Sequence, residues 1–150
     1  MTISKALKIM IATMISFIAA SIADIPQKPQ VIDYVFDYAN LLTPEQVQKI
    51  HDIGLQLDNL TSAELVVITI PTLDGMPIQD YSLALANAWG IGKKDKNNGC
   101  LLLAVADNLL KNRPGRVRIE VGRGLEGCLN DAKCGRILDE LFLPPFLDDT

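Results

Sequence analysis

Two short apolar runs constrain the fold of this chain more than any other feature. The first, Glu64 to Ile70, is β-branched and almost continuously apolar, which predicts a strand buried on both faces of a sheet. The second, Cys100 to Ala106, carries no charge and predicts another fully apolar strand. A third strand is expected at residues 117–121, where Arg118 and Glu120 alternate with valine and isoleucine. One face of that strand should therefore contact water or polar groups.

Three helices are predicted around these strands. The strongest signal is at Thr43, which can cap a helix, with Pro44 at the first helical position and Gln46 completing a capping box. Apolar residues at helical spacing extend this helix to about residue 59. Further helices are predicted at residues 78–89 and 131–142. Because the third strand returns after a short loop, the order of elements predicts an α/β fold with a mixed sheet flanked by helices.

The first residues have the three parts of a secretory signal. Lys5 and Lys8 precede an uncharged, mostly apolar run over residues 9–23, which ends with the small residues Ser21 and Ala23 at positions −3 and −1. The run is shorter than the roughly 20 residues that span a bilayer. We therefore expect a signal peptide cut after Ala23, in preference to an uncleaved anchor or a buried core helix.

The chain that remains after cleavage is acidic. Residues 1–23 contain two lysines and no acid, so 12 basic and 18 acidic residues remain, a net charge near −6. Such a charge disfavours nucleic acid or anionic lipid as a partner. We expect an extended lead-in at residues 24–30, one domain at residues 31–150, and no stable membrane anchor. The expected location is the periplasm or the outside of the cell.

Acidic residues in three loops suggest a site for a hard cation. Asp37 lies in an irregular apolar stretch, Glu126 lies among glycines after the third strand, and Asp131 stands near the start of the third helix. Their oxygens would suit Ca²⁺ or Mg²⁺. A second loop offers further candidates: Asp95, Asn97, Asn98 and Gly99. The alternative is that the three acids are a turn residue, a surface residue and a helix cap.

The glycines and cysteines add two further expectations. The spacing of Gly122, Gly124 and Gly127 matches a dinucleotide fingerprint, but the βαβ context is missing, so no organic cofactor is expected. An exported chain permits a disulfide between Cys128 and Cys134, which could otherwise be small buried residues. The third cysteine, Cys100, is expected in the core. His51, the single histidine of the chain, is expected at the surface.

Four motifs in this order resemble the TPM domain, a family that includes a thylakoid-lumen acid phosphatase and many exported bacterial proteins. The motifs are Asp37-Tyr38-Ala39-Asn40-Leu41-Leu42-Thr43, Trp89-Gly90-Ile91-Gly92, Asn98-Gly99 before Leu101-Leu102-Leu103, and Arg118-Ile119-Glu120-Val121-Gly122 with Gly124-Leu125-Glu126-Gly127. The resemblance implies an α/β/α sandwich around a short mixed sheet. It also implies an envelope or lumenal location, divalent-cation binding in some members, and photosystem repair in photosynthetic ones.

The sequence departs from the family pattern in four places. Asn97 replaces the usual aspartate of an Asp-Asn-Gly turn, which removes a loop carboxylate that Asp95 could replace in part. Asn130 replaces a proline, and Cys128 and Cys134 replace ordinary apolar or small residues. The family's further C-terminal helix is not expected after Pro145, and one flank of the sheet should then be less covered.

Two functions are compatible with this sequence. The first is a non-enzymatic module of the cell envelope that binds a divalent cation and a protein partner. The alternative is a metal-assisted acid phosphatase, in which Arg118 or Arg123 would hold the phosphate. The module is favoured because no nucleophile–base pair is evident and a loop carboxylate is replaced.

Overall fold

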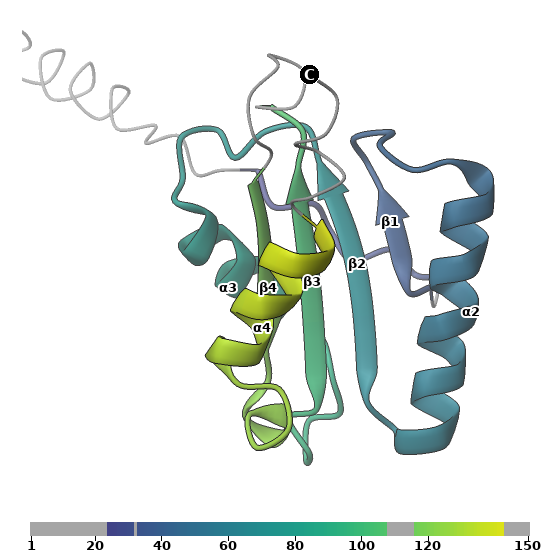
Figure 1. The fold of residues 1–150 in the computed structure, drawn as a ribbon. Coiled ribbons are helices and arrows are strands. Elements are labelled where there is room, and N and C mark those ends of the chain that lie inside the picture. Colours follow the sequence, from purple (N-terminus) through teal and green to yellow (C-terminus); the bar gives the residue numbers. More distant parts are fainter. Residues whose placement is uncertain (1–23, 32, 108–115, 143–150) are drawn as a thin grey trace, which may run out of the picture.

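The computed structural model describes residues 24–31, 33–107 and 116–142 (Figure 1). The predicted signal peptide lies outside these residues. The elements are β1 (Val35–Asp37), α2 (Pro44–Thr61), β2 (Glu64–Ile70), α3 (Ile78–Trp89), β3 (Gly99–Val105), β4 (Arg116–Val121), a 3-10 turn (Arg123–Leu125), α4 (Asp131–Ile137) and a π-helical turn (Leu138–Phe142). None of the helices in the described ranges is long and apolar enough to cross a membrane.

The four strands form one mixed sheet in the order β1-β2-β3-β4. The first three are parallel and β4 runs antiparallel to β3. This confirms the predicted α/β fold with a mixed sheet flanked by helices. The shortest strand, β1, was not predicted, because three residues are too few to show an alternating pattern.

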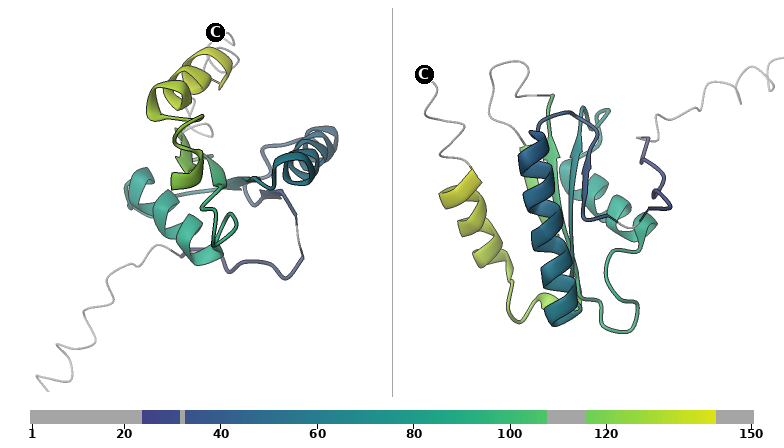
Figure 2. Two further views of the ribbon diagram at one scale, coloured as in Figure 1. Left: turned by 90° about the horizontal axis from the view of Figure 1, so that it is seen from below. Right: turned by 90° about the vertical axis from the view of Figure 1, so that its right-hand side faces the viewer.

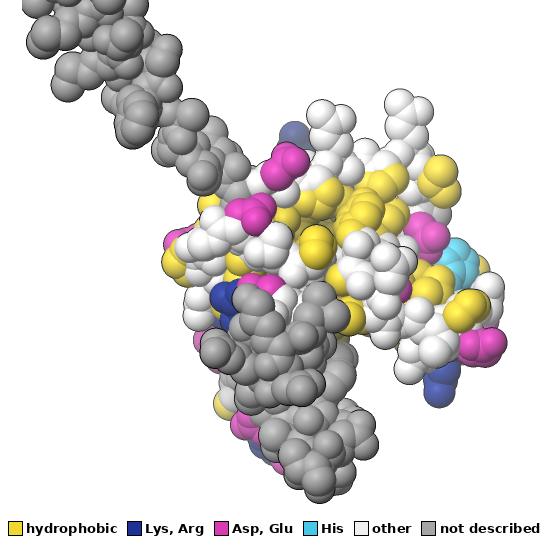
Figure 3. All heavy atoms as spheres, turned by 90° about the horizontal axis from the view of Figure 1, so that it is seen from above, with side chains coloured by type: hydrophobic (Ala, Val, Ile, Leu, Met, Phe, Trp, Pro, Cys, Tyr) yellow, Lys and Arg dark blue, Asp and Glu magenta, His cyan; other side chains and the backbone are white. Residues whose placement is uncertain are grey.

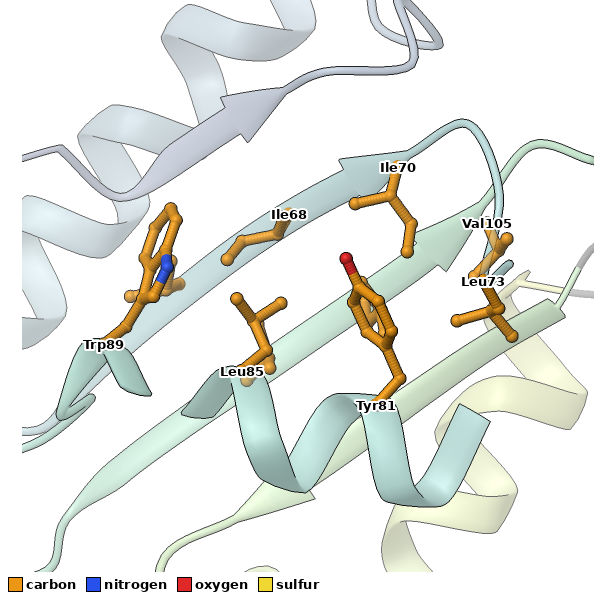
Figure 4. Close-up of a cluster of buried hydrophobic side chains, with 10 residues drawn as sticks. Ile68, Ile70, Leu73, Tyr81, Leu85, Trp89 and Val105 are labelled. Carbon is orange, nitrogen blue, oxygen red and sulfur yellow. The ribbon is translucent and has the colours of Figure 1, made fainter. Parts of the chain in front are cut away.

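Helix α3 covers one face of the sheet, which we call the back face. Tyr81, Leu85 and Trp89 of α3 point toward β2 and β3 (Figure 4) and are at most 3% exposed. The strand side chains that meet them form the main core and are also at most 3% exposed: Val66, Ile68, Ile70, Leu101, Leu103 and Val105. Burial of so much aliphatic surface is the main stabilising term in a domain of this size.

The opposite face of the sheet, which we call the front face, is covered less well. Its central side chains are Leu65 and Val67 from β2, Leu102 and Ala104 from β3, and Val117 and Ile119 from β4, as the strand register requires. Helix α2 runs along the β1 edge, and α4 lies in front of β3 and β4 (Figure 1). Side views show that α4 tilts away from the sheet toward its C-terminal end (Figure 2).

Helix α2 has the capping box that the sequence predicts. The Gln46 amide donates to the Thr43 hydroxyl at 3.3 Å, and the Thr43 amide donates to the Gln46 side chain at 2.8 Å. Gly54 is the buried residue of α2. It packs directly against the Tyr34 side chain, which leaves no room for a larger residue at this position. Half-buried His51 is not a plain surface residue, since its Nδ1 lies 2.8 Å from Asp33.

The lead-in is fastened to α3 by three hydrogen bonds. The Trp89 indole N–H donates to the carbonyl of Pro26 at 2.7 Å. The Tyr81 hydroxyl donates to the carbonyl of Asp24 at 3.3 Å, and the Lys28 ammonium donates to the carbonyl of Trp89 at 2.7 Å. The segment that directly follows the predicted cleavage point is therefore part of the packed domain.

The contact between Gly54 and Tyr34 gives a test of the fold. A Cβ at Gly54 would lie 2.5 Å from the Cβ and Cγ of Tyr34. We expect Gly54→Ala to lower the free energy of unfolding by about 1–3 kcal/mol through overpacking, although alanine favours a helix. Gly135→Ala in α4 is the control, because its Cβ would meet no atom within 4 Å. That variant should gain about 0.5–1 kcal/mol. Urea denaturation measures both, and an equally stable Gly54→Ala variant would contradict the packing.

Candidate functional site

Asp37 organises the turn that joins β1 to α2. Its Oδ1 accepts a hydrogen bond from the amide of Leu41 at 3.0 Å, and its Oδ2 accepts one from the amide of Leu42 at 3.0 Å. The Thr69 hydroxyl, in the adjacent strand, also donates to Oδ1. Thr69 in turn accepts a hydrogen bond from the amide of Ala39 at 3.0 Å. Both carboxylate oxygens therefore hold the chain in this turn.

These hydrogen bonds determine the charge state of Asp37. Burial acts to raise the pKa of its carboxyl, but the bonds from Thr69 and from the amides of Leu42 and Leu41 outweigh burial and hold the pKa below its ordinary value of 3.8. Asp37 is therefore an ionised acceptor at neutral pH. It is poorly suited to exchange protons with a substrate in that range.

The predicted metal ligands lie at opposite ends of the sheet. Asp37 lies where β1 and β2 finish, whereas Glu126 and Asp131 follow the antiparallel β4 and lie where β2 and β3 begin. The β3 segment from Ala104 to Cys100 separates the two ends by about 13 Å, given about 3.3 Å per residue. Ca²⁺–oxygen bonds are only about 2.3–2.6 Å long. The register therefore does not bring Asp37 to the same end of the sheet as Glu126 and Asp131.

No other metal cluster replaces the predicted one in the described ranges, where no three histidine, cysteine or acidic side chains are grouped suitably. Glu126 and Asp131 are exposed. The cap of α4 is Asn130, whose side chain accepts a hydrogen bond from the amide of Lys133 at 3.1 Å. Asp131 therefore takes the position after the cap.

The glycine motifs form a tight backbone contact between two loops. The Gly124 amide donates to the carbonyl of Asn97 at 2.9 Å, and a Cβ at Gly124 would lie 2.0 Å from the carbonyl oxygen of Lys96. Asn98 is buried, with its side chain bonded to the amide of Lys93 at 2.9 Å and to the carbonyl of Ser62 at 2.6 Å. Asn97 is exposed at a positive φ of 48°. Asn97 and Asn98 therefore hold neighbouring loops together through hydrogen bonds.

The two arginines proposed for phosphate binding differ in their surroundings. Arg118 lies on the back face, where its Nε donates to the Ser82 hydroxyl and to Glu120, both at 3.1 Å. Ser82 also donates to Glu120 at 3.0 Å. Arg118 is therefore engaged in a structural cluster beneath α3, whereas Arg123 is exposed in the 3-10 turn. The structure does not bring the two side chains together.

The cysteines are free thiols in this structure, so the predicted Cys128–Cys134 disulfide is not formed. Cys128 is exposed, and its thiol donates to the carbonyl of Leu125 at 3.1 Å. Cys134 is buried, with 7% of its surface exposed. Cys128 precedes α4 in the chain, and Cys134 lies within it. Cys100 is buried, as expected.

A cavity of about 280 Å³ that the sequence did not predict lies between the lead-in and the back face. The lining side chains include Lys28, Phe36, Glu64, Trp89 and Lys93. The edge of Trp89 meets Phe36, with ring centroids 4.9 Å apart. Sequence spacing gives no signal for this cavity, because the lead-in closes it from a distant part of the chain.

The front face is the larger unassigned surface. Leu102 and Ala104 are half-buried although they belong to an interior strand, and Ile119 beside them is also half-buried. Hydrophobic side chains also reach the surface at the end where β1 and β2 finish (Figure 3). There, Tyr38 is 42% exposed.

Comparisons with known proteins identify the family to which this domain belongs. The TPM domain profile matches residues 35–150. The chain belongs to the TPM domain family. The TPM fold here is also similar to the solution NMR structure of the N-terminal domain of a protein from P. gingivalis. The two share 35% sequence identity with a TM-score of 0.67, over 77% of this chain and 69% of that one. A search of curated proteins finds no match.

The role of Asp37 in this TPM domain can be tested by measuring the free energy of unfolding of a variant that lacks its carboxylate. Asp37→Ala should lower the free energy of unfolding at neutral pH by about 1–3 kcal/mol, because buried donors lose their acceptor. Since folding lowers the pKa of Asp37, its contribution is complete above pH 3.8 and is lost as the pH falls through the folded value. In urea denaturation, the difference in free energy of unfolding between Asp37→Ala and the wild type should therefore become smaller as the pH falls below 3.8.

Exposed Glu126 provides the control for this test. Glu126→Ala should change the free energy of unfolding by less than about 0.5 kcal/mol at every pH. Equal stability of the Asp37→Ala variant and the wild type at neutral pH would show that the turn does not depend on this carboxylate.

Proposed function

We propose that this TPM domain is an exported, non-catalytic module that docks an apolar helix of an envelope protein on its front face. The half-exposed side of β3 is the observation that carries this proposal. Parallel strand pairs such as β2 and β3 are usually covered on both faces. Here one face is sealed by α3, whereas Leu102, Ala104 and Ile119 stay half-buried on the other.

The shape of the front face favours a helix as its occupant. Among the described residues, α4 tilts away from the sheet toward its C-terminal end (Figure 2), so its C-terminal half does not follow the front face. The back face of the same sheet is covered by a helix, α3, which presents apolar residues at helical spacing. A partner helix with the same spacing would remove aliphatic surface from water, at about 25 cal/mol per Å².

The surroundings of the candidate catalytic residues support binding more than phosphate chemistry. Asp37 has its carboxylate oxygens occupied by the turn, and Arg118 is paired with Glu120. A phosphatase would need a metal or a base at one place together with a phosphate-binding cation. Asp37 lies on the front face and Arg118 on the back face.

Export is supported by the position of the lead-in. Asp24, the first residue after the predicted cut, already bonds to Tyr81 of α3. A mature chain beginning at Asp24 would therefore retain the whole packed domain. The net charge near −6 of that chain fits a protein partner better than a nucleic acid or an anionic lipid.

Site-specific photo-crosslinking in the native host tests the docking face. A photoreactive phenylalanine at position 119 lies on the front face, and the same residue in place of Leu83, which is 51% exposed on α3, is the control. We expect one discrete adduct from position 119 and none from position 83. Leu102→Lys, placed beside position 119, should abolish that adduct by putting a charge on the docking surface.

The size of the adduct separates the possible occupants. An adduct with twice the mass of the chain would show that a second copy covers the face, which contradicts the proposal. Equal adducts at positions 119 and 83, or none at either, would also contradict it. Circular dichroism of the Leu102→Lys variant confirms that a lost adduct reflects the surface and not unfolding.

A further inference from the structure

We propose that Cys100 and Cys134 form the disulfide of this chain and tie the start of α4 to the start of β3. The disulfide predicted from the sequence, Cys128–Cys134, is replaced by a different pairing. Its formation in the cell rests on the export that the proposed function includes, because oxidising compartments permit disulfides. The pairing itself rests on the placement of the three thiols.

The strand register places Cys100 on the front face. It lies beside Leu65 of β2 and Val121 of β4, on the side of the sheet away from α3. Only 7% of its surface is exposed, whereas Leu102, two residues further along the same face, is half-buried. The front face is therefore covered more completely at the beginning of β3 than at its middle.

The 3-10 turn contacts β3 at this part of the sheet, and helix α4 follows it at the same end. Its N-terminal end lies at the end where β3 begins, in front of β3 and β4 (Figures 1 and 2). Cys134, in the first turn of α4, is the buried residue of that helix, and 7% of its surface is exposed. Cys134 lies near enough to Cys100 to act on its thiol. Together with the burial of both residues, this places Cys134 toward the beginning of β3.

The electrostatics of the two thiols agree with this placement. Burial raises the pKa of Cys100 to about 12, and the nearby Cys134 and Glu120 contribute to the increase. Burial also raises the pKa of Cys134, with a contribution from Asp131. Because the thiolate is the reactive form, both thiols should react slowly with an oxidant while they stay buried as in this structure.

Cys128 is a poorer partner for Cys134. It is exposed, and its thiol is directed to the carbonyl of Leu125 in its own turn. A bond from Cys128 would have to draw Cys134 out of the interior. A bond from Cys100 keeps Cys134 buried and joins two thiols on the same side of the sheet.

The reaction needs a disulfide oxidant, such as oxidised glutathione or a protein disulfide. One cysteine thiolate attacks a sulfur of the oxidant, forms a mixed disulfide and releases one thiol. The second cysteine thiolate then attacks the first cysteine's sulfur and releases the other half as a second thiol. The chain loses two protons and two electrons, and the oxidant is reduced to two thiols. The new bond would join the first turn of α4 to the start of β3.

Oxidation of the purified, reduced domain tests the pairing without reference to export. The chain from Asp24 onward is incubated with oxidised glutathione, in dilute urea where α4 can open, and is then mapped by mass spectrometry under non-reducing conditions. We expect one linked peptide pair containing Cys100 and Cys134, one remaining alkylated thiol at Cys128, and a Tm several degrees higher. Cys128→Ser should give the same linked pair and the same gain.

Two results would overturn the pairing. One is a linked Cys128–Cys134 pair in the wild type, and the other is three alkylated thiols after oxidation. Cell fractionation then tests export separately. Reduced Cys100 and Cys134 in a cytosolic chain that pairs readily in vitro would refute export and leave the pairing intact. An exported chain that fails to pair in vitro would refute the pairing and leave export intact.

Discussion

The packing of α3 against β2 and β3 is the interaction on which the rest of the structure depends. It buries the back-face side chains of both strands almost completely, and the lead-in is bonded to the same helix through Trp89 and Tyr81. Within the described residues, the front face is covered less completely: Leu102, Ala104 and Ile119 stay half-buried. The proposed docking surface lies on this less covered side.

Much of this sheet could be predicted because its strands carry strong local signals. The apolar runs gave β2 and β3 to within one residue, and the capping box at Thr43 gave the start of α2. The strand β1 could not be found in this way. It is held by pairing with β2 and by the contact of Phe36 with Trp89, which are far apart in the sequence.

Because β1 was not predicted, nothing in the sequence indicated that Asp37 lies at the other end of the sheet from Glu126. Asp37 is the last residue of β1 and Asp131 the first of α4, and Glu126 lies between elements. Sequence spacing alone does not tell at which end of the sheet each of them lies. Asp37 ends a parallel strand, whereas Glu126 follows the antiparallel β4. Strands of opposite direction finish at opposite ends of a sheet. The acids are therefore separated, and Asp37 satisfies the turn that follows it.

The same antiparallel return sets the geometry of the front face. Because β4 finishes where β3 begins, the chain enters α4 at that end and the helix leaves the sheet as it rises. Cys134 and Cys100 are buried at the closed end, and Leu102 and Ala104 are half-buried toward the open one. A partner helix would meet the open end, and the proposed Cys100–Cys134 bond would limit how far α4 could move from the other. Binding and redox state would then act on one element, α4, from its two ends.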